Sequence, residues 1–370
     1  MKNTIGKNVA ITLFGESHGE MIGCVVDGLP AGITIDQEFL LQQIDKRKPQ
    51  GSISTTRKES DTPKFVSGIF NGKTTGTPIT ILMENTQQHS KDYSELQYVA
   101  RPSHADYVAN IKYHGCQDYR GGGHFSGRLT APIVASGAIA LQLLQQKGIY
   151  IGSHILQLHN VCDDAFSQGV QVLKEEICKV NELLFAVLND DKANEMTEVI
   201  EQARLQQDSV GGILESAIVG LPVGVGEPFF DSLESVLSHY LFSIGGVKGI
   251  EFGSGFALAS MYGSQANDAF AVFDNQVVTL TNHNGGINGG ISNGMPVILK
   301  TVIKPTPSIA KEQETIHMQT LENTTLSIVG RHDPAIIHRA RVVQDSLIAL
   351  ALVDMLTEVY GTNWWLSCMD

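Results

Sequence analysis

The stretch from Thr130 to Gln146 predicts a long helix that packs closely on a neighbour. Its apolar side chains recur at helical spacing, at Ile133, Val134, Ile139, Leu143 and Leu144. The small residues Ser136 and Gly137 would let a second element approach the helix axis. We predict that Thr130 caps this helix and that Gly148 ends it.

The remaining segments alternate between strand and helix patterns. Apolar runs without a helical period predict strands at 9–14, 21–26, 64–70 and 78–84, and glycine-rich strands within 211–226 and 245–294. Helical spacing and capping residues predict helices at 36–46, from Ser103 onward, across 167–208 with a break at 189–191, at 228–241 and from Asp333 to about Tyr360. Residues 50–62 are polar and predict a loop. No repeat or low-complexity linker divides the chain, so we expect one domain, 1–370, of mixed α and β structure.

The overall charge narrows the classes of ligand. The chain has 370 residues, 42% of them apolar, and a formal net charge of −13. This acidic balance argues against broad binding of nucleic acid or of an anionic membrane, because both need a basic surface. A small anionic ligand is still compatible, since a few converging arginines make a locally positive pocket on an acidic protein.

The cysteines and the apolar runs predict a soluble, cytoplasmic protein. The five cysteines are scattered and form no C-x-x-C pair, which argues against a disulfide framework and a zinc site. No long apolar run near the amino terminus precedes a small-residue cleavage site. The apolar run 347–356 is interrupted by Asp354 and is too short to cross a bilayer.

Two histidines occupy positions suited to proton transfer. Ser17 and His18 lie on a glycine-bounded turn between two predicted strands, and His104 follows Arg101 and Ser103 at a predicted helix start. At a helix amino terminus the dipole disfavours a protonated imidazole, whereas a nearby anion favours it, and such opposed influences suit a general acid. The alternative is that Ser103 and Asp106 form a capping box around an exposed His104. For Asp106 alone this structural interpretation is the favoured one.

Three consecutive glycines, Gly121 to Gly123, predict a loop that approaches an anion. Backbone amides in such a loop come close to a ligand, and the following helix directs its positive end and Arg128 toward the same place. The loop lacks the Gly-Lys-Ser/Thr ending of a nucleotide-binding Walker loop. A single Arg-Gly-Gly in an acidic protein is also weak evidence for RNA binding. A plain surface turn is the alternative, and we favour the ligand loop.

Two further segments carry anion-binding features. Asp333 followed by proline is typical of a helix N-cap, and Arg331 just before it is placed to meet an anion. The extended run 304–308 contributes a lysine and two hydroxyl groups between prolines. Together with the other loops, these segments indicate a ligand with more than one anionic group.

In their order along the chain, these motifs resemble the chorismate synthase family. The resemblance extends from Gly6 to about Leu356, and the ordered set is far more specific than any single motif. The matching segments are GESHG at 15–19, RPSHAD at 101–106, YRGGG at 119–123, GLPVGVGEPFFD at 220–231, VKGIEFGSGF at 247–256, NHNGGINGGIS at 282–292 and GRHDP at 330–334.

The resemblance implies an α+β fold, a β-α-β sandwich in which two antiparallel sheets enclose long helices, assembled as a homotetramer. It implies a lyase of the shikimate pathway of aromatic amino acid biosynthesis. The family converts 5-enolpyruvylshikimate 3-phosphate to chorismate and phosphate by trans-1,4-elimination, and needs reduced FMN although the reaction has no net redox change. It leaves open whether this chain reduces its flavin with NADPH or relies on a separate flavin reductase.

The resemblance also assigns roles to residues. It implies that His18 protonates the departing phosphate, that His104 meets the anionic edge of the flavin, and that Asp333 assists proton removal. Ser17 and Ser126 would be positioning or relay hydroxyls. The expected substrate-binding residues are Arg47, Arg101, Arg128 and Arg331. The expected cofactor-binding residues are His124, Phe125, Ser126, Gly245, Gly246, Gly289, Lys304, Pro305, Thr306, Pro307, Ser308 and Arg331.

The chain departs from the family pattern at a few of these positions. Many members carry Arg-Ser-Ser after the glycines, where this chain has His124, Phe125 and Ser126. Ile53 stands where a second arginine is expected, Gly245-Gly246 replaces a bulkier pair, and Pro307 replaces a serine. Individual flavin and substrate contacts therefore differ from those of such members.

Two other classes of function remain to be distinguished from a lyase. A non-enzymatic flavin- or nucleotide-binding protein would keep the scaffold, but His18, His104 and Asp333 favour an enzyme. A phosphoryl-transfer enzyme would use a pocket rich in anion-binding groups, but the chain lacks a Walker lysine and an obvious acidic pair for magnesium.

Overall fold

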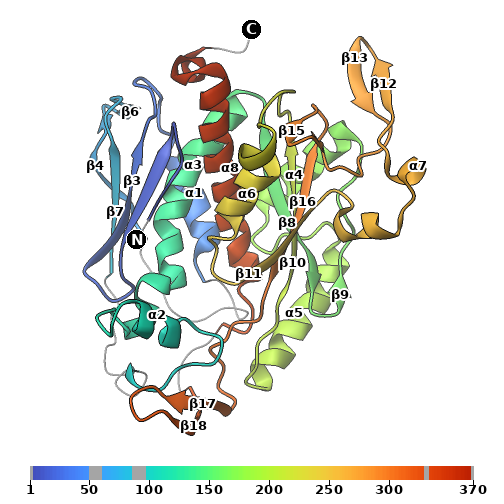
Figure 1. Cartoon of the computed structure of the whole chain (residues 1–370). Helices are drawn as coiled ribbons and strands as arrows, with labels where there is room; N and C mark the ends of the chain where they lie inside the picture. Colours follow the sequence, from blue (N-terminus) through green and yellow to red (C-terminus); the bar gives the residue numbers. More distant parts are fainter. Residues whose placement is uncertain (1–2, 50–60, 86–96, 329–332, 368–370) are drawn as a thin grey trace.

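Two antiparallel sheets lie on either side of a layer of long helices (Figure 1). The computed structural model describes residues 3–49, 61–85, 97–328 and 333–367. The first five-stranded sheet has the order β1 (Thr4–Ile5), β2 (Ala10–Gly15), β3 (Met21–Asp27), β7 (Ile79–Glu84), β4 (Lys64–Ser67). The second has the order β11 (Val247–Phe252), β16 (Val297–Ile303), β10 (Gly212–Val219), β8 (Tyr150–Leu158), β9 (Val161–Cys162). The expected α+β sandwich is confirmed.

The helices between the sheets form the centre of the core. They are α1 (Gln37–Arg47), α3 (Thr130–Gln146), α6 (Leu233–Leu241) and α8 (Ile337–Tyr360). Strand residues such as Ile22 and Ile81 of the first sheet and Leu214 and Leu299 of the second are buried in the same hydrophobic cluster as these helices. On the other face of the second sheet, α4 (Val170–Glu182) packs in a separate hydrophobic cluster with Ala217 and Val219 of β10. Helix α5 (Asp190–Leu205) lies near β9, and its buried residues Met196 and Ile200 belong to the main core (Figure 1).

Helices α3 and α8 approach each other closely at Gly137. A methyl group added at Gly137 would lie 2.6 Å from the Cα of Ser346, so only glycine allows this approach. The expected close packing at Gly137 is confirmed. Residues 120–146 have the length and hydropathy of a membrane span, but 83% of the most apolar window is buried inside the fold, as in a core helix.

Three predicted helix caps are wrong. The N-cap of α3 is Leu129, and the Thr130 hydroxyl donates to the Gly127 carbonyl at 2.6 Å. Ser103 has a left-handed backbone with φ +58°, and α2 (Asp106–Lys112) begins only after Ala105. Helix α8 begins only after Ile336, which is its N-cap, and the Asp333 carboxylate pairs with Arg339. By contrast, the expected break before α5 is confirmed, with Asn189 as its N-cap.

Short hairpins and turns complete the described structure. The hairpins are β5–β6 (Ile69–Phe70, Lys73–Thr74), β12–β13 (Phe270–Phe273, Gln276–Thr279), β14–β15 (Ile287–Asn288, Ile291–Ser292) and β17–β18 (Gln313–His317, Glu322–Leu326). The 3-10 turns are Arg120–Phe125, Gly127–Leu129, Phe229–Asp231, Gly255–Ser260 and Thr362–Leu366, and α7 spans Gly263–Ala266. The β12–β13 hairpin extends away from the body of the molecule, whereas β17–β18 lies near α2 (Figure 1).

Candidate active site

The triple-glycine loop lies between the two histidines that the sequence singled out. Gly121 has a left-handed backbone with φ +58°, and a methyl group there would lie 2.5 Å from His18 Nδ1 and 2.9 Å from Ser17 Oγ. A methyl group at Gly122 would lie 3.5 Å from His104 Nε2. The loop therefore joins segments far apart in the sequence, and its first glycine is required by both conformation and space.

Hydrogen bonds to the glycine loop and to Asn85 fix the turn that carries Ser17 and His18. Both residues are buried, at 1% and 4% exposure. The Ser17 amide donates to the Gly123 carbonyl at 3.0 Å, and Asn85 Nδ2 donates to the carbonyls of Glu16 and Gly19. The same asparagine accepts from Arg128 Nε at 2.9 Å. This network fixes the His18 turn relative to the Arg128 side chain.

Asp106 binds both Arg101 and His104. Arg101 donates from Nε and Nη2 to the carboxylate at 2.7 Å each, and His104 Nδ1 lies 2.8 Å from Asp106 Oδ1. Burial by itself raises the pKa of Asp106, but the hydrogen bonds from Arg101 and His104 lower it well below the ordinary value. The ionised carboxylate keeps the proton of His104 on Nδ1, which leaves Nε2 facing the glycine loop.

Asp61 bridges two of the expected substrate-binding arginines. Its carboxylate lies 2.5 Å from Arg47 Nη2 and also pairs with Arg128 Nη1. All three side chains are buried. Burial favours the neutral carboxyl, but the two guanidinium groups lower the pKa of Asp61 below its ordinary value. The shared carboxylate holds two guanidinium groups side by side, an arrangement that suits a phosphate or carboxylate ligand.

The region of Lys304 and Thr306 adjoins the His104 segment. Lys304 Nζ donates to the Ser103 carbonyl at 2.8 Å, and the Lys304 amide donates to the Gly246 carbonyl at 2.9 Å. The Thr306 hydroxyl is buried and finds no hydrogen-bond partner in the described residues. A methyl group added at Gly245 would meet nothing within 4 Å. An unpaired buried hydroxyl beside open backbone fits a ligand that this structure does not contain.

Three residues of the expected cofactor set directly follow the glycine loop in the sequence. His124 Nδ1 lies 2.8 Å from the carbonyl of Gly15, so this histidine ties the loop to the end of β2. Phe125 is 45% exposed and lies with its ring centroid 6.2 Å from that of Tyr113. Ser126 accepts from the Arg128 amide at 3.3 Å.

The described contacts of the other expected site residues lie elsewhere. Asp333 pairs with Arg339 of α8. Gly289 lies in the β14–β15 turn, whose next residue, Gly290, accepts a hydrogen bond from Leu233. Pro305, Pro307 and Ser308 continue the Lys304 segment without a described contact to either histidine. Arg331, like Ile53, lies outside the described residues.

A family comparison decides between the classes of function. The family model described as chorismate synthase matches residues 9–357, nearly the whole chain. The chain belongs to the chorismate synthase family.

Known relatives agree with this assignment. The chorismate synthase of Methanobrevibacter smithii is 46% identical over 355 residues, covering 96% of each chain. That of Thermococcus kodakarensis is 43% identical, covering 95% of this chain and 96% of its own. A crystal structure of a chorismate synthase superposes with a TM-score of 0.75 at 24% identity, covering 96% of this chain and 94% of that one, which supports the fold. These findings identify a lyase of the shikimate pathway.

Sequence reasoning missed three residues that organise this chorismate synthase-like site. Asp61 lies in a polar stretch that predicted only a loop, and no local signal marked it. Asn85 directly follows β7, and no local signal marks it either. Asp106 was interpreted as a helix-capping residue, although its position five residues after Arg101 and two after His104 was the available signal.

Proposed function

We propose that this chain converts 5-enolpyruvylshikimate 3-phosphate to chorismate and phosphate with reduced FMN. The observation that carries the proposal is the glycine loop packed between His18 and His104, with a buried arginine pair beside it, in a chain of this family. The reaction breaks one carbon–oxygen bond and one carbon–hydrogen bond and forms a double bond. The phosphate therefore needs a proton, and the carbon-bound proton needs an acceptor.

We assign each residue a role in the reaction from its position in the site. His18 is buried beside Ser17 at the glycine loop and donates the proton that the departing phosphate takes up. Arg47 and Arg128 bind the phosphate and carboxylates, and Asp61 holds the two guanidinium groups next to each other. Arg101 and Arg331 complete the substrate-binding set, and Asp333 assists removal of the carbon-bound proton.

The residues expected to hold reduced FMN fit such a group. His104 presents Nε2 while Asp106 holds its other nitrogen, so it can face an anionic edge of the cofactor. Thr306 offers an unpaired hydroxyl, and the open backbone at Gly245 and Gly289 leaves space for a ring or phosphate. Lys304, Pro305, Pro307, Ser308 and Ser126 complete the set, with Gly246, His124 and Phe125 beside them. When bound, the reduced flavin supplies transient electron density to the breaking carbon–oxygen bond.

An anaerobic assay tests this proposal. Purified protein is mixed with dithionite-reduced FMN and 5-enolpyruvylshikimate 3-phosphate, and chorismate absorbance and phosphate release are followed, with oxidised FMN as the control. We expect both products only with reduced FMN. His18→Ala and His104→Ala should each lower the rate roughly 10²- to 10⁴-fold, as for loss of a general acid. A folded, flavin-binding protein that forms no chorismate would overturn the proposal.

Assembly, flavin supply and location are further proposals. We propose a homotetramer of single-domain chains, residues 1–370, because the family resemblance implies that assembly, and sedimentation velocity tests it. The source of reducing equivalents is tested by replacing dithionite with NADPH under anaerobic conditions. Turnover with NADPH indicates intrinsic flavin reduction, and its absence indicates a separate flavin reductase. We infer a cytoplasmic location, in keeping with a soluble biosynthetic family, which fractionation of cells checks.

A further inference from the structure

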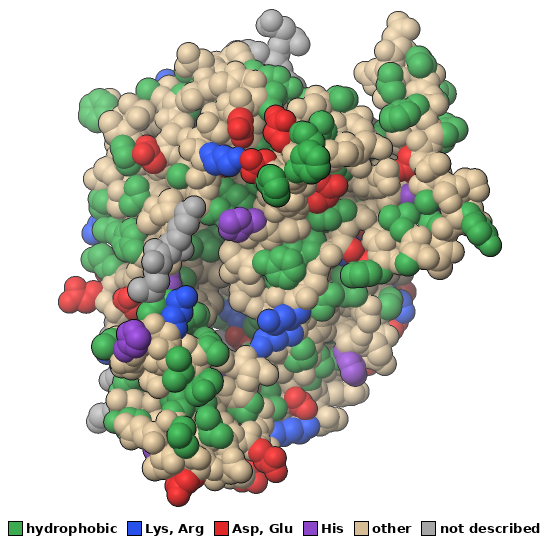
Figure 2. All heavy atoms as spheres, in the orientation of Figure 1, with side chains coloured by type: hydrophobic (Ala, Val, Ile, Leu, Met, Phe, Trp, Pro, Cys, Tyr) green, Lys and Arg blue, Asp and Glu red, His purple; other side chains and the backbone are tan. Residues whose placement is uncertain are grey.

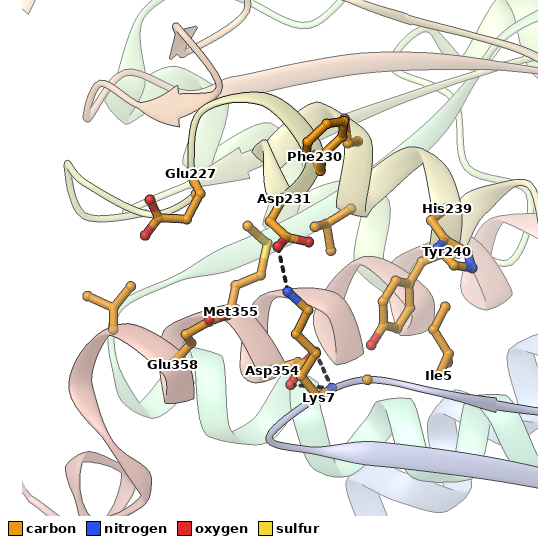
Figure 3. A pocket seen from close by; sticks show the side chains of 15 residues that line it. Ile5, Lys7, Glu227, Phe230, Asp231, His239, Tyr240, Asp354, Met355 and Glu358 are labelled. Atoms are coloured by element: carbon orange, nitrogen blue, oxygen red, sulfur yellow. Dashed lines mark hydrogen bonds and ion pairs between the residues drawn. The ribbon is translucent and has the colours of Figure 1, made fainter.

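A pocket lies at the carboxyl-terminal end of α8. Its volume is about 180 Å³, and it lies between the turn after β1, helix α6 and the last turns of α8 (Figure 3). Figure 2 shows acidic side chains gathered around a basic one over this part of the surface. The carboxylates that line the pocket are Glu227, Asp231, Asp354 and Glu358.

Two of these carboxylates are already engaged. Asp354 accepts hydrogen bonds from the amides of Lys7, Asn8 and Val9 at 2.7 to 3.1 Å. Asp231 pairs with Lys7 Nζ at 2.6 Å, with both side chains about half exposed. Glu227 and Glu358 line the same pocket, are exposed, and form no hydrogen bond or ion pair through their carboxylates with any described residue. One lysine among four carboxylates leaves the pocket negatively charged.

Tyr240 supplies an unpaired hydroxyl to this pocket. The residue is 3% exposed, and its Oη has no hydrogen-bond partner within the described structure. Figure 3 shows the hydroxyl end of Tyr240 directed toward the Lys7 and Asp354 side of the pocket. Burial, and then the charge of Asp354, raise the pKa of Tyr240, so the hydroxyl stays neutral. A buried hydroxyl without a partner is unfavourable, and a ligand that bonds to it removes that cost.

The chemistry of the lining selects the class of ligand. No group of three metal-ligating side chains converges in the described residues, so the carboxylates are too dispersed for a metal ion. The rest of the lining is apolar at Ile5, Val236, Met355 and Val359 and polar at Ser235 and His239, with Phe230 exposed at the rim. The carboxyl end of α8 adds negative helix-dipole potential near Glu358. Carboxylates, an aromatic face and an apolar floor are the combination that binds organic ammonium groups.

We propose that this pocket binds a small organic cation, an ammonium group carried on an apolar body. Tyr240 Oη accepts a hydrogen bond from the ligand, Glu227 and Glu358 supply the attracting charge, and Phe230 covers the apolar part. The site shares none of the residues assigned to the proposed elimination, so a test of this site does not depend on that function.

A fluorinated probe tests the site in the full-length protein. 4-Fluorophenethylamine is titrated and its binding is followed by ¹⁹F NMR line broadening, with 2-(4-fluorophenyl)ethanol as the neutral analogue of the same shape. We expect the amine to bind at least about tenfold more tightly than the alcohol, because charge-assisted bonds are stronger than neutral ones. We also expect its affinity to fall as salt is added. Equal affinity of the two probes, or no binding of the amine at about 10 mM, overturns the proposal.

Substitutions locate the binding. The double variant E227Q/E358Q should lower the affinity for the amine at least about fivefold. Glu198 is an exposed glutamate on α5, and Glu198→Gln should leave that affinity unchanged. Tyr240→Phe should also lower the affinity for the amine. The unliganded variant should be as stable as the wild type or more stable, because an unpaired hydroxyl is removed. Unchanged affinity in both pocket variants would place the probe elsewhere and reject this site. Chorismate formation should be unaffected in all of them.

Discussion

Gly121 packs so tightly against His18 that an added methyl group would lie 2.5 Å from its Nδ1. The backbone there is also left-handed, at φ +58°. The loop and the histidine turn therefore have one mutual arrangement, and a side chain at Gly121 must displace one of them.

We expect Gly121→Ala to abolish chorismate formation while the protein still folds. The left-handed backbone and the clash with His18 should together cost roughly 1–3 kcal/mol, an amount that a stable domain tolerates. Activity and thermal unfolding are measured on the same preparation. Gly127→Ala is the matched control, because a methyl group there meets nothing within 4 Å. Equal activity of the two variants would contradict the proposed role of the loop.

Asp106→Asn should lower turnover roughly 10²-fold, as is usual when the partner that orients a functional histidine is lost. The amide cannot serve as a carboxylate acceptor for both Arg101 and His104. Steady-state kinetics and thermal unfolding of the same preparation check this. A variant with reduced stability but unchanged turnover would assign Asp106 a structural role only.

Asp61→Asn should destabilise the fold by about 3–5 kcal/mol near neutral pH, because Arg47 and Arg128 would remain buried with their shared carboxylate removed. Asparagine is a suitable replacement, since it tolerates the left-handed φ of +39° at this position. Urea denaturation of both proteins measures the difference.

The Asp61 effect should depend on pH with a defined sign. The folded-state pKa of Asp61 lies below the ordinary 3.8, so its contribution is fully present above that value and is lost as the pH falls through the folded pKa. The difference in free energy of unfolding between wild type and Asp61→Asn should therefore shrink below about pH 4. A difference that stays constant down to acid pH would be inconsistent with an ionised Asp61.

His154 should give stability that disappears in alkaline solution. Its two ring nitrogens lie 3.1 Å from Asp163 and 3.0 Å from Glu215, inside the second sheet. Burial alone lowers the pKa of His154, but the two carboxylates raise it above the ordinary 6.5. The stabilisation is fully present below pH 6.5 and is lost as the pH rises through the folded pKa.

The pH dependence of unfolding tests this assignment of His154. Wild type should lose free energy of unfolding between neutral and alkaline pH, and His154→Gln should lose less over the same range. Parallel curves for the two proteins would show that another group is responsible.

The sequence alone predicted the elements whose pattern is local. The core helix at 130–146, the strands around the His18 turn and the break before Asp190 follow from spacing and capping residues, and the structure confirms them. The ordered motifs were enough to predict the family, which the comparison confirms. The three wrong caps have two causes. Thr130 and Asp333 bond to other partners, and Ser103 has a left-handed backbone. Neither feature can be predicted from the neighbouring residues.

What the sequence by itself determined is the set of chemical groups: a histidine in a glycine-bounded turn, a second histidine after an arginine, further arginines and a glycine loop. Only the tertiary structure decided which of them meet. It placed Gly121 against His18 and Gly122 against His104, and it joined Arg47 to Arg128 through Asp61, a residue without any local signal. The physical reason is that helical and strand periodicity indicate only which face of an element is buried. Contacts between separate elements depend on how the sheets and helices pack. A buried charge then pairs with the partner that this packing brings near.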